Sequence, residues 1–434
     1  MKLKVNLISL GCPKNLVDSE VILGRLGEAG YAFTSLYKDA DIIIINTCSF
    51  INKARSESYK IISRIACQKS PSQKLIVCGC LPQLKKRKLF LRYPQIDALI
   101  GSADFYKIDK IIEQLLEGEK RLFSVNEPRF LYDSSFPRLL STPPSYAYLK
   151  IAEGCSNHCS YCLIPYLRGR YRSRPVEDVV KEAKALVNLD IKELILVAQD
   201  ITFYGWDKGE KSALIQLLNE LEKIDKLNWI RLLYAHPLHF TSSLIKTIAT
   251  SDKICRYIDI PLQHTHNEIL VKMKRPKFEV AERLIAKLRE EIPGVTLRTT
   301  FIVGFPGEKD KHVNKLLKDI ERIKFEWLGA FTYSPEKGTL AYSLAPKIPL
   351  KIKKRRYAQL MQLQQPITLN FNQEKVDKVY SILVDKENEG HTEFQAPEID
   401  GKTFLKEKHL PGESFSGKIL QVKNYYDLVV EKSG

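Results

Sequence analysis

The chain has 434 residues, nine cysteines and a formal net charge of +17 at pH 7. Its length exceeds what one ordinary core supports and predicts about two to three domains. No stretch approaches the ~20 apolar residues of a membrane span, and residues 1–10 read as a strand rather than a signal peptide, so we expect a cytoplasmic protein without a membrane partner. The odd number of cysteines argues against a disulfide framework and favours metal or redox chemistry.

The first part of the chain is predicted to be an α/β layer domain over residues 1–125. Residues 2–9 alternate as a strand, and the apolar runs 41–46 and 75–78 are typical of buried parallel strands, with helical segments between them. Residues 128–145 are rich in proline and serine and have neither the helical nor the strand periodicity of apolar residues, so we expect a linker there.

The central region, residues 140–366, is predicted to be a partial parallel (β/α) barrel. Amphipathic helices such as 176–188 and 280–291 alternate with six strand candidates. These candidates span residues 148–153, 193–199, 230–235, 257–261, 297–305 and 329–334. Functional side chains of such barrels lie at the carboxyl ends of the strands, and on this interpretation that edge carries Cys155, Gln199, His236, Gln263 and Gly304.

The last region, residues 367–434, is predicted to be a small antiparallel β-barrel. A basic helix beginning near Lys351 is expected to end at Pro366, and short strands with glycine turns follow it. The region holds nine lysines and twelve acidic residues, so its net charge is −3. An acidic module suits a basic protein partner better than RNA phosphates.

Positive charge elsewhere in the chain favours a polyanionic partner, and the ribosome, transfer RNA and free RNA all fit. Two basic runs, residues 85–88 (KKRK) and 351–356 (KIKKRR), stand out. Because such runs are more often solvated helix faces than binding sites, they identify no site by themselves.

The strongest local signal is the C-x-x-x-C-x-x-C run formed by Cys155, Cys159 and Cys162 directly after a predicted strand. Three thiolates leave one iron of a 4Fe–4S cluster open, whereas a structural zinc takes four ligands. A zinc knuckle completed by His158 or His264 is the alternative, and the spacing and the βα context disfavour it.

With the aromatic Tyr161 before its last cysteine, this run resembles the motif of the radical S-adenosylmethionine superfamily. The resemblance implies that the open iron binds the amino and carboxylate groups of S-adenosylmethionine and that a 5′-deoxyadenosyl radical is formed. It also implies that Cys155, Cys159 and Cys162 are the catalytic cluster ligands.

Cys12, Cys48 and Cys80 each follow a predicted strand in the first domain. A single buried cysteine is most simply a small apolar residue, but three at equivalent strand ends favour a shared site. Together with the radical motif they resemble the methylthiotransferase family over essentially the whole chain. In that family the corresponding cysteines hold a second 4Fe–4S cluster, and two S-adenosylmethionine molecules deliver a methylthio group.

Five residues are candidates for binding the cofactor: Tyr161, Gln199, Gln263, Arg298 and Gly304. Glycine lets a backbone approach a ligand closely, although a strand-to-helix turn can require glycine in any case. The three cysteines outside both motifs, Cys67, Cys78 and Cys255, are interpreted as structural.

Within the family, the segments at 11–20 (GCPKNLVDSE), 198–207 (AQDITFYGWD) and 395–401 (QAPEIDG) resemble the RimO type rather than the transfer-RNA branch. The resemblance implies a TRAM-like last domain and methylthiolation of an aspartate β-carbon in small-subunit ribosomal protein twelve. It further implies the ribosome as a partner and an electron donor such as flavodoxin or ferredoxin. A transfer-RNA adenosine methylthiotransferase and a cluster protein without radical activity remain the alternatives.

Overall fold

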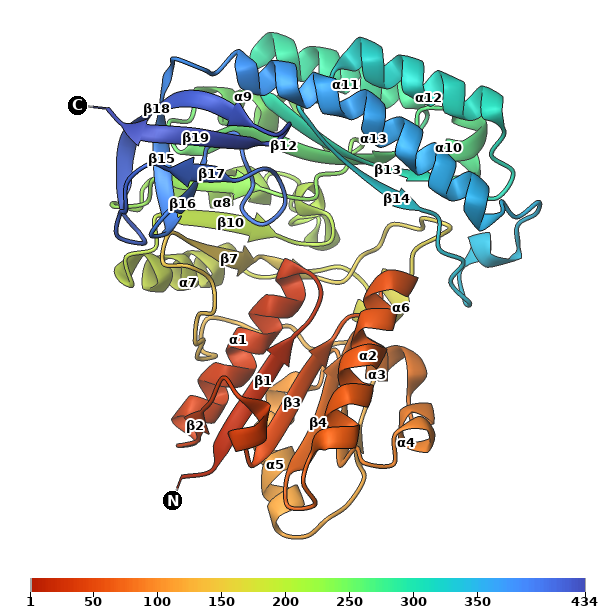
Figure 1. The fold of residues 1–434 in the computed structure, drawn as a ribbon, viewed down its shortest axis with the longest axis vertical. Helices are drawn as coiled ribbons and strands as arrows, with labels where there is room; N and C mark the ends of the chain where they lie inside the picture. The colour runs from red at the N-terminus through yellow and green to blue at the C-terminus, as the bar shows by residue number, and fades with distance from the viewer. Residues whose placement is uncertain (1, 434) are drawn as a thin grey trace. The chain divides into compact units, whose positions relative to one another are not determined.

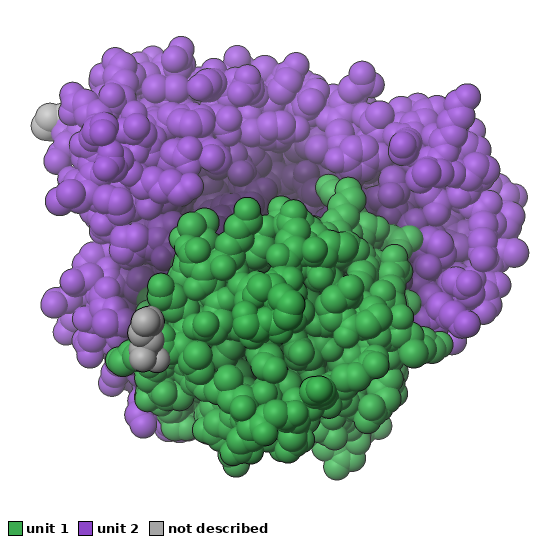
Figure 2. Space-filling view, turned by 60° about the horizontal axis from the view of Figure 1, so that its bottom comes forward, with its two compact units in different colours: residues 1–141, 152–157, 162–174 green, residues 142–151, 158–161, 175–434 purple. Residues whose placement is uncertain are grey.

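The computed structural model describes residues 2–433. The chain divides into two compact units, coloured green and purple in Figure 2. Unit 1 comprises residues 1–141, 152–157 and 162–174, and unit 2 comprises residues 142–151, 158–161 and 175–434. None of the described helices is both long and apolar enough to cross a membrane.

Unit 1 is built on a six-stranded parallel sheet in the order β2-β1-β3-β4-β5-β6 (Figure 1). The strands are β1 (Lys4–Ser9), β2 (Ala32–Phe33), β3 (Ile42–Thr47), β4 (Lys74–Gly79), β5 (Ala98–Gly101) and β6 (Leu122–Ser124). The helices are α1 (Pro13–Glu28), α2 (Asn52–Gln68), α3 (Cys80–Lys85), α4 (Lys88–Arg92) and α5 (Ile108–Leu116), with 3-10 turns η1 (Tyr37–Asp39) and η2 (Phe105–Lys107). The strands predicted near residues 2–9, 41–46 and 75–78 are present as β1, β3 and β4.

One face of this sheet forms a core with α2, α3 and α4. Alternate residues of the central strands point to the same face, so Ile43 and Ile45 of β3 and Val77 of β4 meet Ile62 of α2 and Leu89 of α4. Helices α2 and α4 bury one side against the sheet and expose residues on their other sides, whereas α3 is largely buried.

Unit 1 also contains the short strands β8 (Ala152–Glu153) and β9 (Arg172–Ser173), which pair antiparallel, and helix α6 (Ile164–Arg168). Leu163 and Leu167 pack against Cys80 in a small apolar cluster. The cluster joins residues that are more than eighty positions apart in the chain and fixes α6 beside the start of α3.

Unit 2 begins with a six-stranded parallel sheet in the order β14-β13-β12-β11-β10-β7 (Figure 1). The strands are β7 (Tyr146–Lys150), β10 (Glu193–Val197), β11 (Trp229–Leu232), β12 (Ile254–Gln263), β13 (Thr296–Val303) and β14 (Trp327–Thr332). The helices are α7 (Val176–Asn188), α8 (Ala213–Glu222), α9 (Ser242–Thr250), α10 (Asn267–Met273), α11 (Phe278–Glu291) and α12 (Asp310–Ile323), with 3-10 turns η3 (Ile201–Phe203), η4 (Trp206–Lys208) and η5 (Leu340–Ser343). The alternation matches the predicted partial barrel.

The C-terminal strands close into a five-stranded barrel in the order β15-β16-β17-β19-β18. They are β15 (Val379–Lys386), β16 (Glu389–Thr392), β17 (Thr403–Leu405), β18 (Ser414–Lys423) and β19 (Asp427–Lys432). The pairs are antiparallel as predicted except for β17 with β19, which run parallel and close the barrel.

The helix expected to end at Pro366 is longer than predicted: α13 runs from Leu350 to Gln373 with Pro366 inside it. Proline removes one backbone donor from a helix and usually kinks it. Here buried polar side chains before and after Pro366 hold the helix in place. Gln364 donates to Phe325 O at 2.7 Å, Thr368 donates to Glu326 O at 2.9 Å, and Asn372 donates to Tyr425 O at 3.0 Å. Tertiary hydrogen bonds therefore outweigh the local preference of proline.

Candidate metal centres

Three cysteines meet at the carboxyl ends of strands in unit 1. Cys12 caps the start of α1 after β1, Cys48 follows β3 directly, and Cys80 is the first residue of α3 after β4. Gly11 lies close to Cys48: a Cβ atom added to Gly11 would be 2.5 Å from Cys48 Cβ and 2.9 Å from Cys48 Sγ. Gly11 also has a φ of +103°, so both its conformation and its lack of a side chain allow this approach.

The electrostatics of the three thiols suit a cation. Burial, followed by the charges of Cys12 and Cys80, raises the pKa of Cys48 to about 12. Burial also raises the pKa of Cys80, against the opposing effect of Arg168. Thiolates bind metals, and thiolates that influence one another's charge repel unless a positive centre lies between them. The donor set therefore fits an iron–sulfur cluster with three protein ligands.

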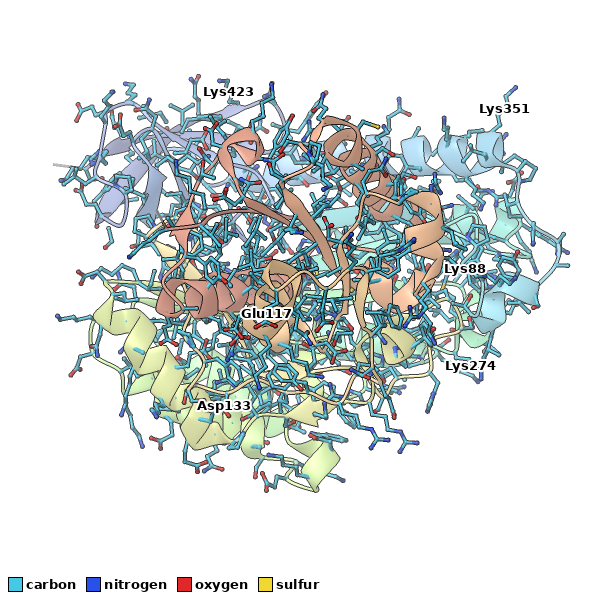
Figure 3. The ribbon with its side chains drawn as sticks, turned by 90° about the horizontal axis from the view of Figure 1, so that it is seen from below. Lys88, Glu117, Asp133, Lys274, Lys351 and Lys423 are labelled. Carbon is cyan, nitrogen blue, oxygen red and sulfur yellow. The ribbon has the colours of Figure 1, made fainter. Side chains whose placement is uncertain are left out.

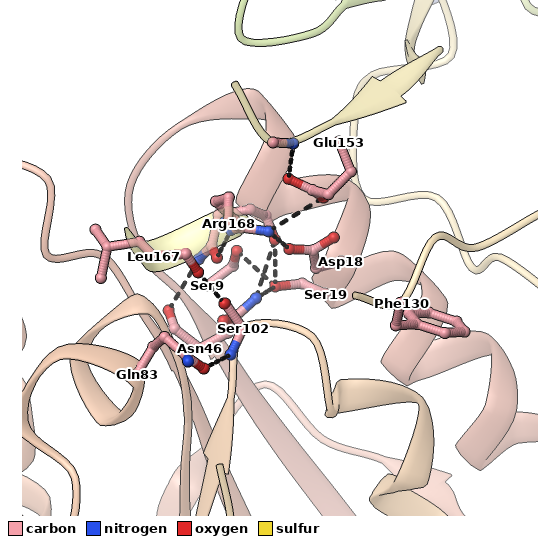
Figure 4. A network of polar contacts seen from close by, with 12 residues as sticks. Ser9, Asp18, Ser19, Asn46, Gln83, Ser102, Phe130, Glu153, Leu167 and Arg168 are labelled. Carbon is pink, nitrogen blue, oxygen red and sulfur yellow. Dashed lines mark hydrogen bonds and ion pairs between the residues drawn. The ribbon is translucent and has the colours of Figure 1, made fainter. Parts of the chain in front are cut away.

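Arg168 of α6 supplies positive charge beside Cys80. Figure 4 shows this arginine with its partners Asp18 and Glu153. Its Nη1 donates to Asp18 Oδ2 at 2.5 Å and lies 3.4 Å from Glu153 Oε2, and its Nη2 donates to Asn15 Oδ1 at 3.0 Å. Burial disfavours the charged guanidinium, but Cys80, Asp18 and Glu153 outweigh it and hold the pKa of Arg168 well above its ordinary value. A permanent cation is thus fixed next to the Cys80 thiol.

The strand ends that carry the cysteines are tied together by buried amides and hydroxyls (Figure 4). Asn46 Nδ2 donates to Ser19 Oγ at 2.8 Å and to Asn15 O at 3.0 Å, and Ser19 Oγ donates to Ser9 Oγ at 2.8 Å. Thr47 Oγ1 donates to Cys78 O at 2.6 Å. These bonds fix the spacing of the strand ends before any metal binds.

The C-x-x-x-C-x-x-C segment is irregular between β8 and α6. In unit 1, Cys155 N donates to Gly169 O at 3.1 Å, and Ile164 N lies 3.4 Å from Cys162 Sγ. Gly169 has a φ of +79°, and a Cβ there would come within 2.3 Å of Pro128 O. The backbone of the segment therefore depends on glycine at 169.

In unit 2, the middle of the same segment is anchored to the end of α10. Ser160 N donates to Met273 O at 3.0 Å, and Ser160 Oγ donates to Lys272 O at 2.6 Å. Tyr161 packs in an apolar cluster with Met273 and neighbouring residues, so its aromatic ring has a packing role. Arg275 Nη1 lies 4.0 Å from Cys159 Sγ, which places a cation beside this thiol as Arg168 does beside Cys80.

Four of the residues predicted at the edge of the barrel do lie at carboxyl ends of strands in unit 2. Gln199 follows β10, His236 follows β11, Gln263 ends β12 and Gly304 follows β13. Gln263 has a φ of +74°, a strained value for a residue with a side chain, and such strain is concentrated at functional sites. Gly304 N donates to both carboxylate oxygens of Glu308 at 2.9 Å, so this backbone donor is already used within the protein.

Arg298, the fifth predicted cofactor residue, does not lie at this edge. It is the third residue of β13, and its guanidinium is 3.1 Å from Asp259 Oδ1 and 3.3 Å from Asp400 Oδ1. Asp400 belongs to the C-terminal region after β16, so Arg298 joins the parallel sheet to the barrel. Its charge is used in this buried ion pair.

Sequence reasoning missed His239, which pairs with Asp200 at the same edge. His239 Nδ1 is 2.9 Å from Asp200 Oδ2, and Thr202 Oγ1 donates to Asp200 Oδ1 at 2.8 Å. His236 stacks on His239 with ring centroids 4.9 Å apart, and burial followed by the charge of Arg275 lowers the pKa of His236 to about 3. Asp18, Glu153 and Arg275 were missed as well, because their partners are distant in sequence.

His264, one of the two histidines of the alternative zinc site, lies among groups of the protein. His264 is fully buried, and its Nδ1 accepts hydrogen bonds from the N–H groups of Thr265 and His266 at 2.9 Å. Its Nε2 lies 3.7 Å from Glu308 Oε2. Both ring nitrogens therefore face groups of the protein. Of the remaining cysteines, Cys67 is exposed, whereas Cys78 and Cys255 are buried.

Comparison with known proteins identifies the family of the chain. The model of uncharacterized protein family UPF0004 matches residues 4–101, and that of the radical SAM superfamily matches residues 149–320. The protein named ribosomal protein uS12 methylthiotransferase RimO of Trichlorobacter lovleyi is 45% identical over 99% of this chain and 98% of its own length. The protein of the same name from Pelotomaculum thermopropionicum is 46% identical over 99% of each chain.

Solved structures show a similar fold at low sequence identity. The radical S-adenosylmethionine methyltransferase TsrM from Kitasatospora setae has a TM-score of 0.58 and 16% identity, with 76% of this chain and 73% of that chain covered. The cobalamin-dependent radical enzyme OxsB has a TM-score of 0.53 and 13% identity, with 84% and 56% covered. Together, the matches confirm the predicted fold class, and the chain belongs to the RimO type of the radical S-adenosylmethionine methylthiotransferases, a family whose cofactors are S-adenosylmethionine and two 4Fe–4S clusters.

Proposed function

We propose that this enzyme transfers a methylthio group to the β-carbon of an aspartate in small-subunit ribosomal protein uS12. The observation that carries the proposal is the gathering of Cys12, Cys48 and Cys80 at three strand ends in a chain that also has the radical motif. The names of relatives 43–46% identical over most of the chain support uS12 as the substrate.

Cys155, Cys159 and Cys162 would hold the radical S-adenosylmethionine cluster, and the three cysteines of unit 1 would hold the second cluster. When bound, S-adenosylmethionine would supply the methyl group and the organic radical that abstracts a hydrogen atom, and the second cluster would carry the sulfur, so that a C–S bond replaces a C–H bond. The Cβ–H bond of an aspartate is too weakly acidic for an ordinary side-chain base, so a radical route suits this substrate.

The chain itself positions the ligands and balances their charge. Arg168 neutralises part of the thiolate charge near Cys80, and Asp18 and Glu153 hold its guanidinium in one orientation. Arg275 has the corresponding place beside Cys159, where Pro261 O accepts from its Nη2 at 2.6 Å. Gln199 and Gln263, at the carboxyl ends of β10 and β12, are the side chains we assign to S-adenosylmethionine.

The C-terminal barrel is the part of unit 2 we assign to substrate recruitment. Residues 367–434 carry a net charge of −3, with nine lysines and twelve acidic residues, whereas uS12 is a basic protein. A soluble electron donor such as flavodoxin or ferredoxin and a cytoplasmic location complete the proposal.

The test is a parallel assay on protein and RNA. The anaerobically reconstituted enzyme is incubated with S-adenosylmethionine, dithionite and sulfide, with purified uS12 or with unmodified transfer RNA, and both products are analysed by mass spectrometry. A methylthio mass gain on an aspartate of uS12 is expected. A gain on adenosine alone would instead establish the transfer-RNA alternative.

Cluster content separates the two metal centres. The Cys12→Ala/Cys48→Ala/Cys80→Ala variant should lose about four of about eight irons per chain and still cleave S-adenosylmethionine to 5′-deoxyadenosine. Cys159→Ala should abolish 5′-deoxyadenosine, and Cys67→Ser, which changes an exposed cysteine outside both sets, should change neither quantity. A wild-type plateau at about four irons would refute the second cluster.

A further inference from the structure

Residues 51–96 of unit 1 have a net charge of +10, out of +17 for the whole chain. Residues 51–96 contain eleven lysines and arginines and a single acidic residue, Glu57. The whole chain has 68 basic and 51 acidic residues, so this short segment departs strongly from the average. The KKRK run at residues 85–88, which the sequence leaves without a role, lies within it.

The fold gathers these charges on one side. Helices α2, α3 and α4 bury their apolar sides in the same core cluster on one face of the sheet. Their cations therefore point away from that core. We define the basic face as five exposed residues: Lys53, Lys60, Arg64, Lys88 and Arg92. Figure 3 labels Lys88 on α4.

The basic face is ordered along α2 and between helices. Lys53, Lys60 and Arg64 follow one another at spacings of seven and four residues, which puts them on the same side of a helix. The guanidinium of Arg92 lies 4.3 Å from the centroid of the Tyr59 ring, a contact between α4 and α2. This stacking fixes the arginine plane, so less side-chain entropy is lost when it binds an anion.

The other helices of the sheet lack this charge. Helix α1 carries two basic and three acidic residues, and α5 carries one basic and two acidic residues. Arg25 of α1 and Asp109 of α5 form an ion pair. The excess of positive charge is thus specific to α2–α4 and is not a general property of the helices of unit 1.

A dense array of lysines and arginines suits phosphate and suits a protein partner poorly. Lysine is depleted at protein–protein interfaces, and a basic protein substrate would be repelled by this face. RNA releases counterions when lysines and arginines neutralise its phosphates, and this release favours binding. The chemistry of the basic face therefore matches an RNA backbone.

We propose that the basic face binds the phosphate backbone of ribosomal RNA next to uS12 in the small ribosomal subunit. This inference rests on the proposed function, because it takes its RNA from the particle that contains the protein substrate. The face then adds affinity for the assembled particle, whereas the free protein substrate gains nothing from it.

The test uses the full-length reconstituted enzyme with four neutralising substitutions on the basic face: Lys53→Gln, Lys60→Gln, Arg64→Gln and Lys88→Gln. Binding to purified small ribosomal subunits is measured by filter retention at several salt concentrations. We expect affinity to fall by at least about tenfold and the salt dependence to weaken by about one unit of slope for each phosphate that the variant no longer neutralises. Methylthiolation of isolated uS12 should remain at the wild-type rate.

A matched control removes four exposed lysines from helices α7, α9 and α12 of unit 2: Lys181→Gln, Lys184→Gln, Lys246→Gln and Lys318→Gln. This variant should bind subunits within about twofold of wild type. Equal loss of affinity in both variants would mean that net charge alone drives binding, and an unchanged affinity of the first variant would remove the RNA role. Either outcome overturns the inference.

Two further measurements distinguish ribosomal RNA from other polyanions and distinguish a failure of this inference from a failure of the proposed function. Loss of affinity for transfer RNA or for phosphatidylserine vesicles, with normal binding to subunits, would reassign the basic face and overturn the ribosomal assignment. Failure of the wild-type enzyme to modify isolated uS12 would contradict the proposed function, whereas the subunit-binding comparison would still report on the face.

Discussion

Arg168 and Asp18 are 150 positions apart in the sequence, and Nη1 of the arginine donates to Oδ2 of the aspartate at 2.5 Å in a fully buried pair. Breaking one side of a buried pair is more damaging than removing both sides, because it leaves an uncompensated charge. Arg168→Gln should lower the free energy of unfolding by about 3–5 kcal/mol. Arg168→Gln/Asp18→Asn should recover part of that loss. Denaturant unfolding followed by circular dichroism measures both, and a double variant no more stable than Arg168→Gln would contradict the expectation.

Gly11 should be essential for the second cluster and not for the first. A side chain at this position would collide with Cys48, whose Cβ would lie 2.5 Å from the added carbon. We expect Gly11→Ala to lose about half of the bound iron and to retain 5′-deoxyadenosine formation. Gly30→Ala is the matched control, since Gly30 also has a positive φ, +85°, but has no atom within 4 Å of an added Cβ. Equal iron loss in both variants would show that backbone strain, and not the collision with Cys48, is responsible.

Arg275 should tune the radical S-adenosylmethionine cluster. Its Nη1 lies 4.0 Å from Cys159 Sγ, and positive charge near a cluster favours the reduced state. Arg275→Gln should therefore shift the reduction potential to more negative values, and Arg275→Lys should restore part of the shift. Redox titration monitored by electron paramagnetic resonance gives the potential. Arg256→Gln, which removes an exposed arginine on the neighbouring β12, should leave the potential unchanged.

His391 should make the docking of the C-terminal barrel dependent on pH. Although burial disfavours its charge, Asp385 and Glu193 raise the pKa of His391 from 6.5 to about 9. A raised pKa in the folded state means that the stabilisation is fully present below the unfolded value of 6.5 and is lost as pH rises through about 9. The loss should be on the order of 3 kcal/mol.

Urea unfolding followed by tryptophan fluorescence between about pH 6 and pH 10 measures this loss, because the Trp229 ring packs against the His391 ring. His391→Gln should be less stable at the lower pH and should have a flatter profile. His409→Gln, a second histidine of the barrel, serves as the control. A wild-type profile that stays level from about pH 6 to pH 10 would show that His391 does not titrate in this range.

Much of the fold could be predicted because runs of apolar residues in the local sequence indicate its strands. The run Ile42–Ile45 is apolar at every position and forms β3, a central strand buried on both faces. The positions of Cys12, Cys48 and Cys80 could be predicted to converge for the same reason, since parallel strands end at one edge. Family resemblance then supplied the chemistry that spacing alone leaves open.

The remaining features depend on interactions that no local pattern contains. Arg168 and Arg275 lie beside Cys80 and Cys159 only after distant segments pack together. Arg298 has the sequence context of a cofactor residue, yet Asp259 and Asp400 bind it, and Asp400 is 102 positions away. Helix α13 continues through Pro366 because Gln364 and Thr368 find buried acceptors in the turn that precedes β14.

Helix α13 has a consequence for how the barrel works. One uninterrupted helix with buried polar anchors leads into β15. The barrel is therefore held in a fixed position and does not move freely relative to the parallel sheet. It is thus a rigid docking surface. A protein that binds to it is held in one orientation relative to the sheet edge of unit 2. Selectivity would then arise from alignment, and a partner of the right charge but the wrong shape would dock without presenting its reactive carbon.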